Sequence, residues 1–414
     1  MASSAVAAII ARASFVSPPI ALRLVCEAPC MHVSVPKGVK LVAAAFVAAT
    51  ALRNRIRAFR ARGSQRIKTS MAAFEEISGL AALRPSKAER ESSEKNCLTK
   101  PKSTEKFVVK TLALVVHGVK SRESKGVGEL KKIRAECEKR GITVTEHLTL
   151  HEGHCETLVR ELDVTGVDAI AVMGGDGTLR EAVSAFQGRP KDEHRVCFAF
   201  PCGTGNNFAR DLGLKTISDV FGAVDRGTAH PVDCVKVTHP GGVTYSVNCV
   251  TWGMARDAAA TAEGMRWLGP VRYDLAGFYH IMKGKTNHAK LAASDDINKP
   301  AYAKGEHKDY MMMFAQNTRC SGRGFTFTPS AKLDDGKFDL VAVHKRGTFK
   351  TVGLFDQVKA GGAHVEDDAC CYVQCHSAAL AAEDTDDLVG IDGEVHVKTP
   401  ITIECVAGAF TTLV

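Results

Sequence analysis

Three glycines, one aspartate and one threonine follow directly on an apolar segment near the middle of the chain, which reads DAIAVMGGDGTL over residues 168–179. Glycines let backbone N–H groups approach an anion closely, and the helix expected at residues 179–186 would add the positive end of its dipole. The turn at residues 174–178 therefore predicts a phosphate-binding site. It is neither a P-loop nor a dinucleotide fingerprint, because it lacks the Gly-Lys-Ser/Thr ending and the G-x-G-x-x-G spacing.

A second glycine-rich turn, PCGTGNNFARDLG at residues 201–213, follows the next expected strand. Carboxyl ends of parallel strands meet at one edge of a sheet, so two such turns can converge on one ligand. Thr204 and Asn206 would offer a hydroxyl and an amide to a phosphate or a ribose. Arg210 would offer a positive charge, although an arginine on a helix more often faces solvent.

The segments around these turns alternate between apolar strands and amphipathic helices, which predicts parallel β-α-β units. The expected strands cover residues 107–116, 142–147, 169–173 and 196–200, and the expected helices cover residues 128–140, 155–162 and 179–186.

After residue 233 the pattern changes to short alternating segments bounded by Gly, Pro and Asp-Gly pairs, which predicts an antiparallel sandwich. The expected strands cover residues 235–237, 245–250, 310–315, 325–328, 338–344 and 394–406. One helical, partly apolar stretch at residues 258–282 interrupts them and contains Trp267, Tyr273 and Phe278. We expect it to pack against the sandwich; the alternative is one wall of a hydrophobic acceptor pocket.

Residues 1–70 differ in composition from the remainder of the chain. They hold 11 Lys and Arg against the single acid Glu27, whereas residues 71–414 hold 43 Lys and Arg against 45 acids. The body of the protein is therefore not basic, and no nucleic-acid partner is expected. An Arg- and Ser-rich, acid-poor start is typical of a plastid or mitochondrial transit peptide, which predicts an organellar protein, or a cytoplasmic one if this segment is not a transit peptide.

Within this leader, residues 41–52 form an apolar run of 12 residues followed by five arginines. A helix needs roughly 20 apolar residues to span a bilayer. A cleaved, unstructured leader is favoured over an interfacial segment that holds the protein against anionic lipid. Residues 71–105 are polar and rich in Ser, Lys and Glu, which predicts a linker.

Four motifs together carry a resemblance to a known family. They are GGDGT at residues 174–178, GTGNNFARDLG at 203–213, LDDGKFDL at 333–340 and DGE at 392–394. Their order and spacing resemble the diacylglycerol kinase and sphingosine kinase family of lipid kinases, over roughly residues 107–414. The resemblance implies a Rossmann-like parallel α/β nucleotide-binding domain (106–233), an antiparallel β-sandwich domain (234–414) whose last strand returns to the first domain, and an active site in the cleft between them.

The resemblance also implies roles for individual residues. Asp335 would bind Mg²⁺ together with the backbone carbonyls of Lys332 and Lys337, and Glu394 would accept the proton of the acceptor hydroxyl. Contacts to ATP fall on Thr149, Thr204 and Asn206 and on the phosphate-binding loop itself, which consists of Gly174, Gly175, Asp176, Gly177, Thr178, Leu179 and Arg180.

Phosphoryl transfer needs charge neutralised on the phosphates and a hydroxyl held in line with the transferred group. A nearby carboxylate must accept the proton as the new bond forms, and either Glu394 or Asp176 could do this. We prefer Glu394 as the base and assign Asp176 to organising ATP or the metal. Asp-Gly pairs such as those at residues 335 and 392 are also ordinary hairpin turns.

Two loops depart from the family pattern. The first strand is followed by HGVKSR at residues 117–122 rather than by Asn-Pro-x-Ser-Gly, and SGRG stands at residues 321–324 where the family often has three glycines. Gly118 and Lys120 could still approach phosphate. Arg323 could bind an acidic headgroup or simply face solvent.

These observations predict an ATP- and Mg²⁺-dependent kinase that phosphorylates a hydroxyl of diacylglycerol, a sphingoid base or a related lipid. The enzyme would reach this substrate by peripheral contact with a membrane surface. The alternatives are a soluble kinase similar to NAD kinase, which also carries GGDGT before a helix, and a nucleotide- or lipid-binding pseudokinase. The oligomeric state does not follow from the sequence.

Overall fold

The computed structural model describes residues 84–85, 97–98, 105–118, 124–265, 268–269, 271–298, 301, 307–322 and 325–414. The predicted leader, most of the predicted linker, Lys120, Trp267 and Arg323 lie outside these residues. The span Met71–Val414 forms one compact unit. None of its described helices is both long enough and apolar enough to cross a membrane.

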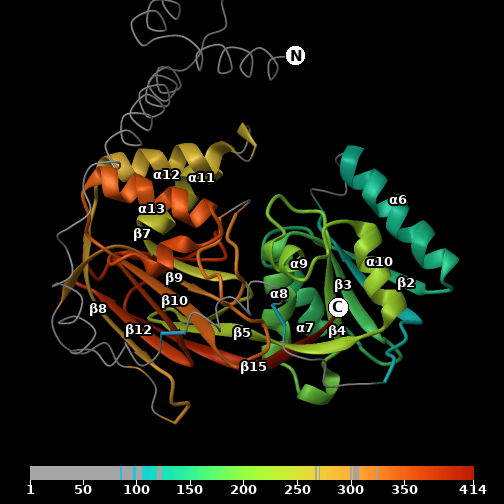
Figure 1. Cartoon of the computed structure of the whole chain (residues 1–414). Helices are drawn as coiled ribbons and strands as arrows, with labels where there is room; N and C mark the ends of the chain where they lie inside the picture. Colours follow the sequence, from blue (N-terminus) through green and yellow to red (C-terminus); the bar gives the residue numbers. More distant parts are fainter. Residues whose placement is uncertain are drawn as a thin grey trace, which may run out of the picture. The chain divides into compact units, whose positions relative to one another are not determined.

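The first described sheet is parallel and has the strand order β2-β1-β3-β4 (Figure 1). Its strands are β1 Thr111–Val116, β2 Thr143–Leu148, β3 Ala169–Gly174 and β4 Val196–Pro201. Its helices are α6 Ser124–Lys139, α7 His154–Glu161, α8 Asp176–Gln187, α9 Asn207–Asp211 and α10 Ile217–Arg226, with a short 3-10 helix at Lys191–Glu193.

Helices cover both faces of this sheet, because its central strands are apolar on both sides. On β1, Ala113 and Val115 pack with α7 and α8, whereas Leu112 and Leu114 pack with α6 and α10. The glycine-rich turns therefore lie at the carboxyl ends of β3 and β4, as the sequence predicts. The parallel α/β fold class is confirmed.

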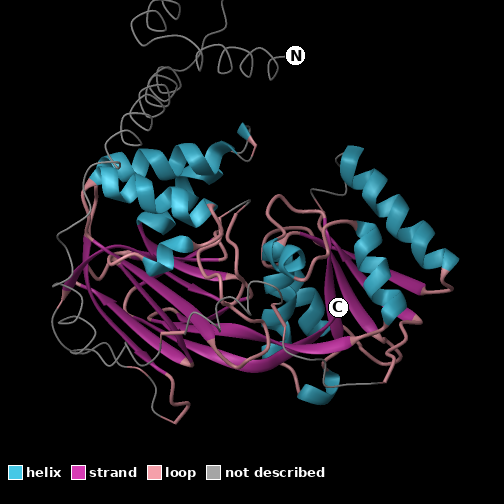
Figure 2. Cartoon of the chain, in the orientation of Figure 1, coloured by secondary structure: helices cyan, strands magenta, loops and turns pink. Residues whose placement is uncertain are grey.

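The second described sheet is antiparallel, has 11 strands and curls around one apolar core (Figure 2). The strands of its first half are β5 Ala229–His239, β6 Gly242–Ser246, β7 Cys249–Gly253, β8 Asn287–Ser294, β9 Lys308–Gln316 and β10 Phe338–His344. Those of its second half are β11 Cys370–Cys375, β12 Ser377–Ala382, β13 Leu388–Ile391, β14 Val395–Lys398 and β15 Ile401–Leu413. The expected antiparallel β domain is confirmed.

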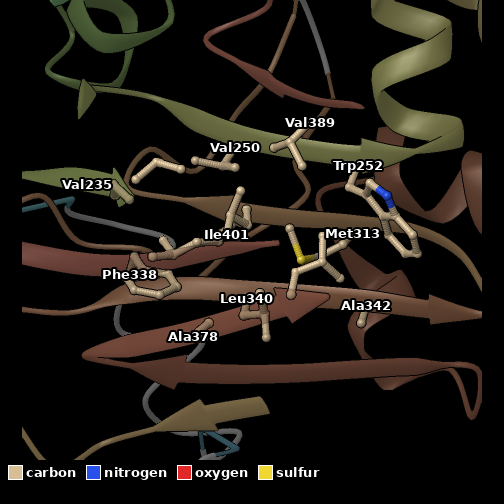
Figure 3. Packing of buried hydrophobic residues seen from close by; sticks show 14 of the residues in the cluster. Val235, Val250, Trp252, Met313, Phe338, Leu340, Ala342, Ala378, Val389 and Ile401 are labelled. Carbon is tan, nitrogen blue, oxygen red and sulfur yellow. The ribbon is translucent and has the colours of Figure 1, made fainter. Parts of the chain in front are cut away.

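Its core is built from side chains that alternate along neighbouring strands. Trp252, Met313 and Leu340 come from β7, β9 and β10 and are buried together with Val389 and Ile401 (Figure 3). Three helices, α11 Met254–Glu263, α12 Val271–Lys283 and α13 Thr348–Lys359, lie together beside this sheet, and a 3-10 helix follows at Ala363–Glu366 (Figure 1).

The last strand connects the two domains. β15 pairs with β5 along its length, with a register shift between Val406 and Phe410. Beyond that shift, Phe410 is buried with the residues of the first domain and its ring centroid lies 5.7 Å from that of Phe208. One strand thus contributes to both hydrophobic cores.

Three of the expected strands of the second domain differ in the structure. Residues 245–250 form the end of β6 and the start of β7, because the chain turns at Val247 and Asn248. Residues 325–328 form no strand; Phe325 and Phe327 are both buried against α13, and only an isolated bridge joins Cys320 to Thr326. The expected strand at 394–406 is interrupted before Ile401, where Pro400 has no N–H for a ladder.

The helical stretch expected at 258–282 is two helices, α11 and α12, and α13 was not predicted. The inner side of α12, which includes Ala276, His280 and Ile281, is buried. This burial agrees with the expected packing against the β domain.

We expect Phe410→Ala to lower the free energy of unfolding by about 3–5 kcal/mol, because it opens a cavity where β15 enters the first core. Phe349→Ala is the matched control, since Phe349 is 59% exposed and its loss should change stability by at most about 0.5 kcal/mol. Chemical denaturation compares the two variants. Equal denaturation midpoints for Phe410→Ala and Phe349→Ala would contradict the role assigned to β15.

Candidate active site

Asp176 joins the two glycine-rich turns. It is the first residue of α8, and its carboxylate accepts hydrogen bonds from the backbone N–H groups of Asn207 (2.9 Å) and Phe208 (3.2 Å) at the start of α9. Burial raises the pKa of Asp176, and the nearby carboxylate of Asp392 adds to the rise, whereas the two N–H groups oppose it. The two glycine-rich turns thus lie side by side, and the side chain of Asp176 links them.

The second turn is held by its own residues. Asn206 adopts a left-handed conformation (φ 52°), accepts the N–H of Gly203 at 2.8 Å and donates to the carbonyl of Pro201 at 2.9 Å. A Cβ on Gly203 would lie 2.5 Å from the Cα of Gly175, so the two turns touch through backbone. Asn206 thus shapes the turn, whereas Thr204 at its tip is exposed.

Thr149 fixes the start of the altered first loop. It follows β2, and its hydroxyl accepts the N–H of Gly118 at 3.1 Å. The N–H of His117 donates to the carbonyl of Met173 at 3.2 Å, next to the first glycine-rich turn. The loop after β1 therefore begins at the same edge of the sheet as Gly174, although it lacks the family's Asn and Pro.

The side chains that follow in α8 point into the protein. Thr178, Leu179 and Arg180 are all buried, so Leu179 could contact a ligand only through its backbone. A Cβ on Gly174 would overlap the side chain of Thr178. The next residue, Glu181, accepts the N–H groups of Gly153 (3.0 Å) and Cys155 (3.1 Å) and so caps α7, a contact that was not predicted from the sequence.

The DGE motif forms a tight hairpin between β13 and β14. Asp392 (φ 50°) and Gly393 (φ 80°) are both left-handed, as a type I′ turn requires. The carboxylate of Asp392 accepts the Ser246 hydroxyl at 2.6 Å and the N–H groups of Val247, Asn248 and Cys249 at 3.0, 3.1 and 2.9 Å. Asp392 thereby fixes the hairpin to the turn between β6 and β7.

This hairpin brings Glu394 to the first glycine-rich turn. The exposed side chain of Glu394 lies directly against the backbone of Gly177, where an added Cβ would overlap its Oε2 atom and lie 2.6 Å from its Cδ. Asn248, which is 1% exposed, lies beside Asp176 and lowers the pKa of that carboxyl. Residues of both domains thus meet at the amino end of α8.

Asp335 forms a separate acidic group with Asp233 and Asp334. The pKa of Asp335 is raised to about 6, mainly by burial; the charges of Asp233 and Asp334 add to this rise, and the N–H of Lys337 opposes it. Asp233 itself accepts the N–H groups of Gly336 (2.7 Å) and Gly408 (2.8 Å). Within the described residues, no hydrogen bond or ion pair links Asp335 to Asp176.

The described part of the chain contains no group of three His, Cys, Asp or Glu side chains placed to hold a metal. One half-buried carboxylate at Asp335, flanked by the backbone of Lys332 and Lys337, suits Mg²⁺, which takes oxygen ligands and usually keeps several waters.

A cavity of about 530 Å³ lies beside the second turn, with a lining from both domains that includes Asn207, Arg210, Lys215 and Arg319. Asp211 is the acid in this lining, and it pairs with Arg319 (Nε to Oδ1, 2.9 Å). Among the described residues, no acid lies within ion-pair distance of Arg210 or Lys215. The cavity therefore carries positive charge that suits an anionic ligand, and Lys215 was not predicted from the sequence.

Comparison with known proteins identifies two successive domains in this chain. Residues 112–237 match the family model of the diacylglycerol kinase catalytic domain, and residues 248–414 match that of the YegS C-terminal NAD kinase beta sandwich-like domain.

Similar proteins carry the names of lipid kinases. A protein of Stenotrophomonas maltophilia named Probable lipid kinase YegS-like is 24% identical over 69% of this chain and 91% of its own length. Sphingosine kinase 1 of Arabidopsis thaliana is 22% identical over 62% of each chain. The crystal structure of a diacylglycerol kinase from Bacillus anthracis, at 23% identity, covers 73% of this chain and 96% of its own with a TM-score of 0.59, and shows the same fold.

The two family models follow each other along the chain in the order of the two observed domains, and the four sequence motifs lie within them. The resemblance drawn from those motifs is confirmed. The chain belongs to the family of lipid kinases, phosphotransferases that join a diacylglycerol kinase catalytic domain to a YegS-type C-terminal domain.

Proposed function

We propose that this chain is an ATP- and Mg²⁺-dependent kinase that transfers the γ-phosphoryl group to a hydroxyl of diacylglycerol, a sphingoid base or a related lipid. The observation that carries this proposal is the contact of Glu394 with the backbone of Gly177. It places a carboxylate of the second domain at the helix terminus where a phosphate would bind.

Backbone groups and cations would hold the phosphates. Residues 174–177 lie at the amino end of α8, where the first N–H groups have no carbonyl partner within the helix, while Thr149, Thr204 and Asn206 form or support the loops around it. The positively charged cavity beside Asn207 adds Arg210 and Lys215. When bound, Mg²⁺ neutralises phosphate charge, and Asp335 with the carbonyls of Lys332 and Lys337 would hold it.

Glu394 is better placed than Asp176 to accept a proton. Both carboxylate oxygens of Asp176 already accept backbone N–H groups of α9, so its orientation is fixed by the turn that it organises. Glu394 is exposed, and the carboxylate of Asp392, two residues before it, holds its hairpin. A general base needs an accessible oxygen within hydrogen-bond reach of the acceptor hydroxyl.

The direct test incubates the full chain with labelled ATP, Mg²⁺ and a panel of acceptors that contains diacylglycerol, sphingosine, phosphatidylglycerol and NAD⁺. We expect labelled lipid. Label on NAD⁺ alone, or on no acceptor with a folded protein, would contradict the proposal.

Glu394→Gln and Asp176→Asn should each lower kcat by at least about a hundredfold, because one loses proton transfer and the other the order of the phosphate site. The two differ in stability: Asp176→Asn should also lower Tm, since an amide cannot accept both N–H groups of α9. Glu383→Gln, an exposed glutamate before β13, is the matched control. Wild-type turnover in Glu394→Gln would refute its assignment as the base.

Gly177→Ala should lower kcat at least tenfold without loss of stability, because the new methyl group displaces the Glu394 carboxylate while alanine favours a helix. Gly128→Ala in α6 is the control, since a Cβ there has nothing within 4 Å. Steady-state kinetics and thermal melts of both variants provide the comparison. Unchanged kcat in Gly177→Ala would show that Glu394 need not lie at this position.

Asp335→Asn should raise the Mg²⁺ concentration needed for half-maximal activity, because the neutral amide binds a hard cation more weakly than a carboxylate does. Asp386→Asn, whose side chain is 77% exposed, is the control. An Mg²⁺ titration that coincides with that of the unchanged protein would count against a metal site at Asp335.

A further inference from the structure

The outward side of α12 is apolar. Its residues recur at helical spacing and form one stripe, opposite the buried stripe that holds Ala276 and Ile281. The water-facing side of a helix normally carries charged residues. Here the outward stripe consists of Val271, Leu275, Phe278, Tyr279 and Met282, of which Val271, Tyr279 and Met282 are 49%, 47% and 56% exposed.

α13 extends this surface. It runs antiparallel to α12, because Lys359 near its end pairs with Asp274 and Phe355 packs on Gly277. The first turn of α13 therefore lies beside the carboxyl end of α12. That turn presents Phe349, which is 59% exposed.

Lysines gather at the same end. Lys283, Lys285 and Lys350 are exposed, and the Nζ atom of Lys283 lies 5.1 Å from the ring centre of Tyr279. Among the described residues, no acid lies within ion-pair distance of Lys283 or Lys350, and Lys285 is 4.0 Å from Asp257. Exposed apolar groups with exposed lysines beside them are typical of a surface that binds anionic lipid.

We propose that this surface, the α12–α13 patch, docks the protein on an anionic lipid bilayer. The patch comprises the stripe of α12, Phe349 and the three lysines. The proposal rests on the proposed function, since a bilayer is where a lipid acceptor resides. The apolar side chains would enter the boundary between headgroups and acyl chains, and the lysines would contact the headgroups.

A second copy of this chain is a poorer occupant. A symmetric dimer through the patch would place its apolar residues together but would bring the lysine groups of both copies close to one another. Like charges oppose such an interface, whereas an anionic membrane surface attracts them.

The test measures binding of the full chain, without ATP, to vesicles of equal parts phosphatidylcholine and phosphatidylserine. Changing Lys283, Lys285 and Lys350 together to glutamine should weaken binding about a hundredfold, because each lysine contributes about fivefold near such a surface. The control changes Lys125, Lys131 and Lys132 of α6 to glutamine and removes the same charge. Equal affinities for the two triple variants would overturn the proposal.

A second pair of variants tests the apolar part. Met282→Glu with Phe349→Glu should weaken binding at least tenfold, whereas Val243→Glu with Ile297→Glu, two exposed positions elsewhere, should weaken it far less. Equal loss in both pairs would contradict apolar insertion. So would a change from dimer to monomer caused by the first pair in the absence of vesicles.

Activity on a short-chain lipid dissolved below its micelle concentration separates this proposal from the proposed function. We expect the docking variants to keep that activity while they lose vesicle binding. Absent activity with normal vesicle binding would count against the proposed function alone, and activity with unchanged binding in the variants would count against the patch alone.

Discussion

The candidate active site depends on the way in which Asp392 holds the backbone between β6 and β7. Its carboxylate accepts three N–H groups and one hydroxyl. Hydrogen bonds to a charged group contribute about 1.5–3 kcal/mol each, so this anchor is strong enough to fix a hairpin of only two short strands. Because Glu394 follows Asp392 by two residues, the anchor also sets where Glu394 lies.

Asp392 and Asp176 perform parallel tasks on the two sides of the site. Each carboxylate binds backbone N–H groups of a loop distant in sequence, and each lies beside a position where a ligand contact is proposed. The charge of Asp392 also contributes to the raised pKa of Asp176. Removing one of these acids would therefore change both the geometry of the site and its electrostatics.

Glycine is needed at two close contacts around the candidate active site. At Gly177 a side chain would occupy the space of the Glu394 carboxylate, and at Gly203 it would press on the backbone of Gly175. The glycines of the GGDGT and GTG motifs are thus required by close contacts within the protein as well as by the proposed phosphate binding.

The elements with a clear hydrophobic pattern could be predicted from the sequence. β3 and β10 begin where the apolar runs begin, and both glycine-rich turns follow their strands. The anchors could not be predicted, because they join residues far apart in the chain. The pattern at Asp392 also fits an ordinary Asp-Gly turn, and nothing in the sequence distinguishes Glu181 from other acids, whereas the fold places backbone N–H groups beside both.

We infer that Asp392 acts on turnover through the position of Glu394. A double-mutant cycle on kcat tests this, with Asp392→Asn, Glu394→Gln and the two combined. We expect the double variant to turn over as slowly as Glu394→Gln alone, because a misplaced base and a missing base slow the same step. A double variant whose loss of kcat equals the product of the two single losses would contradict this inference.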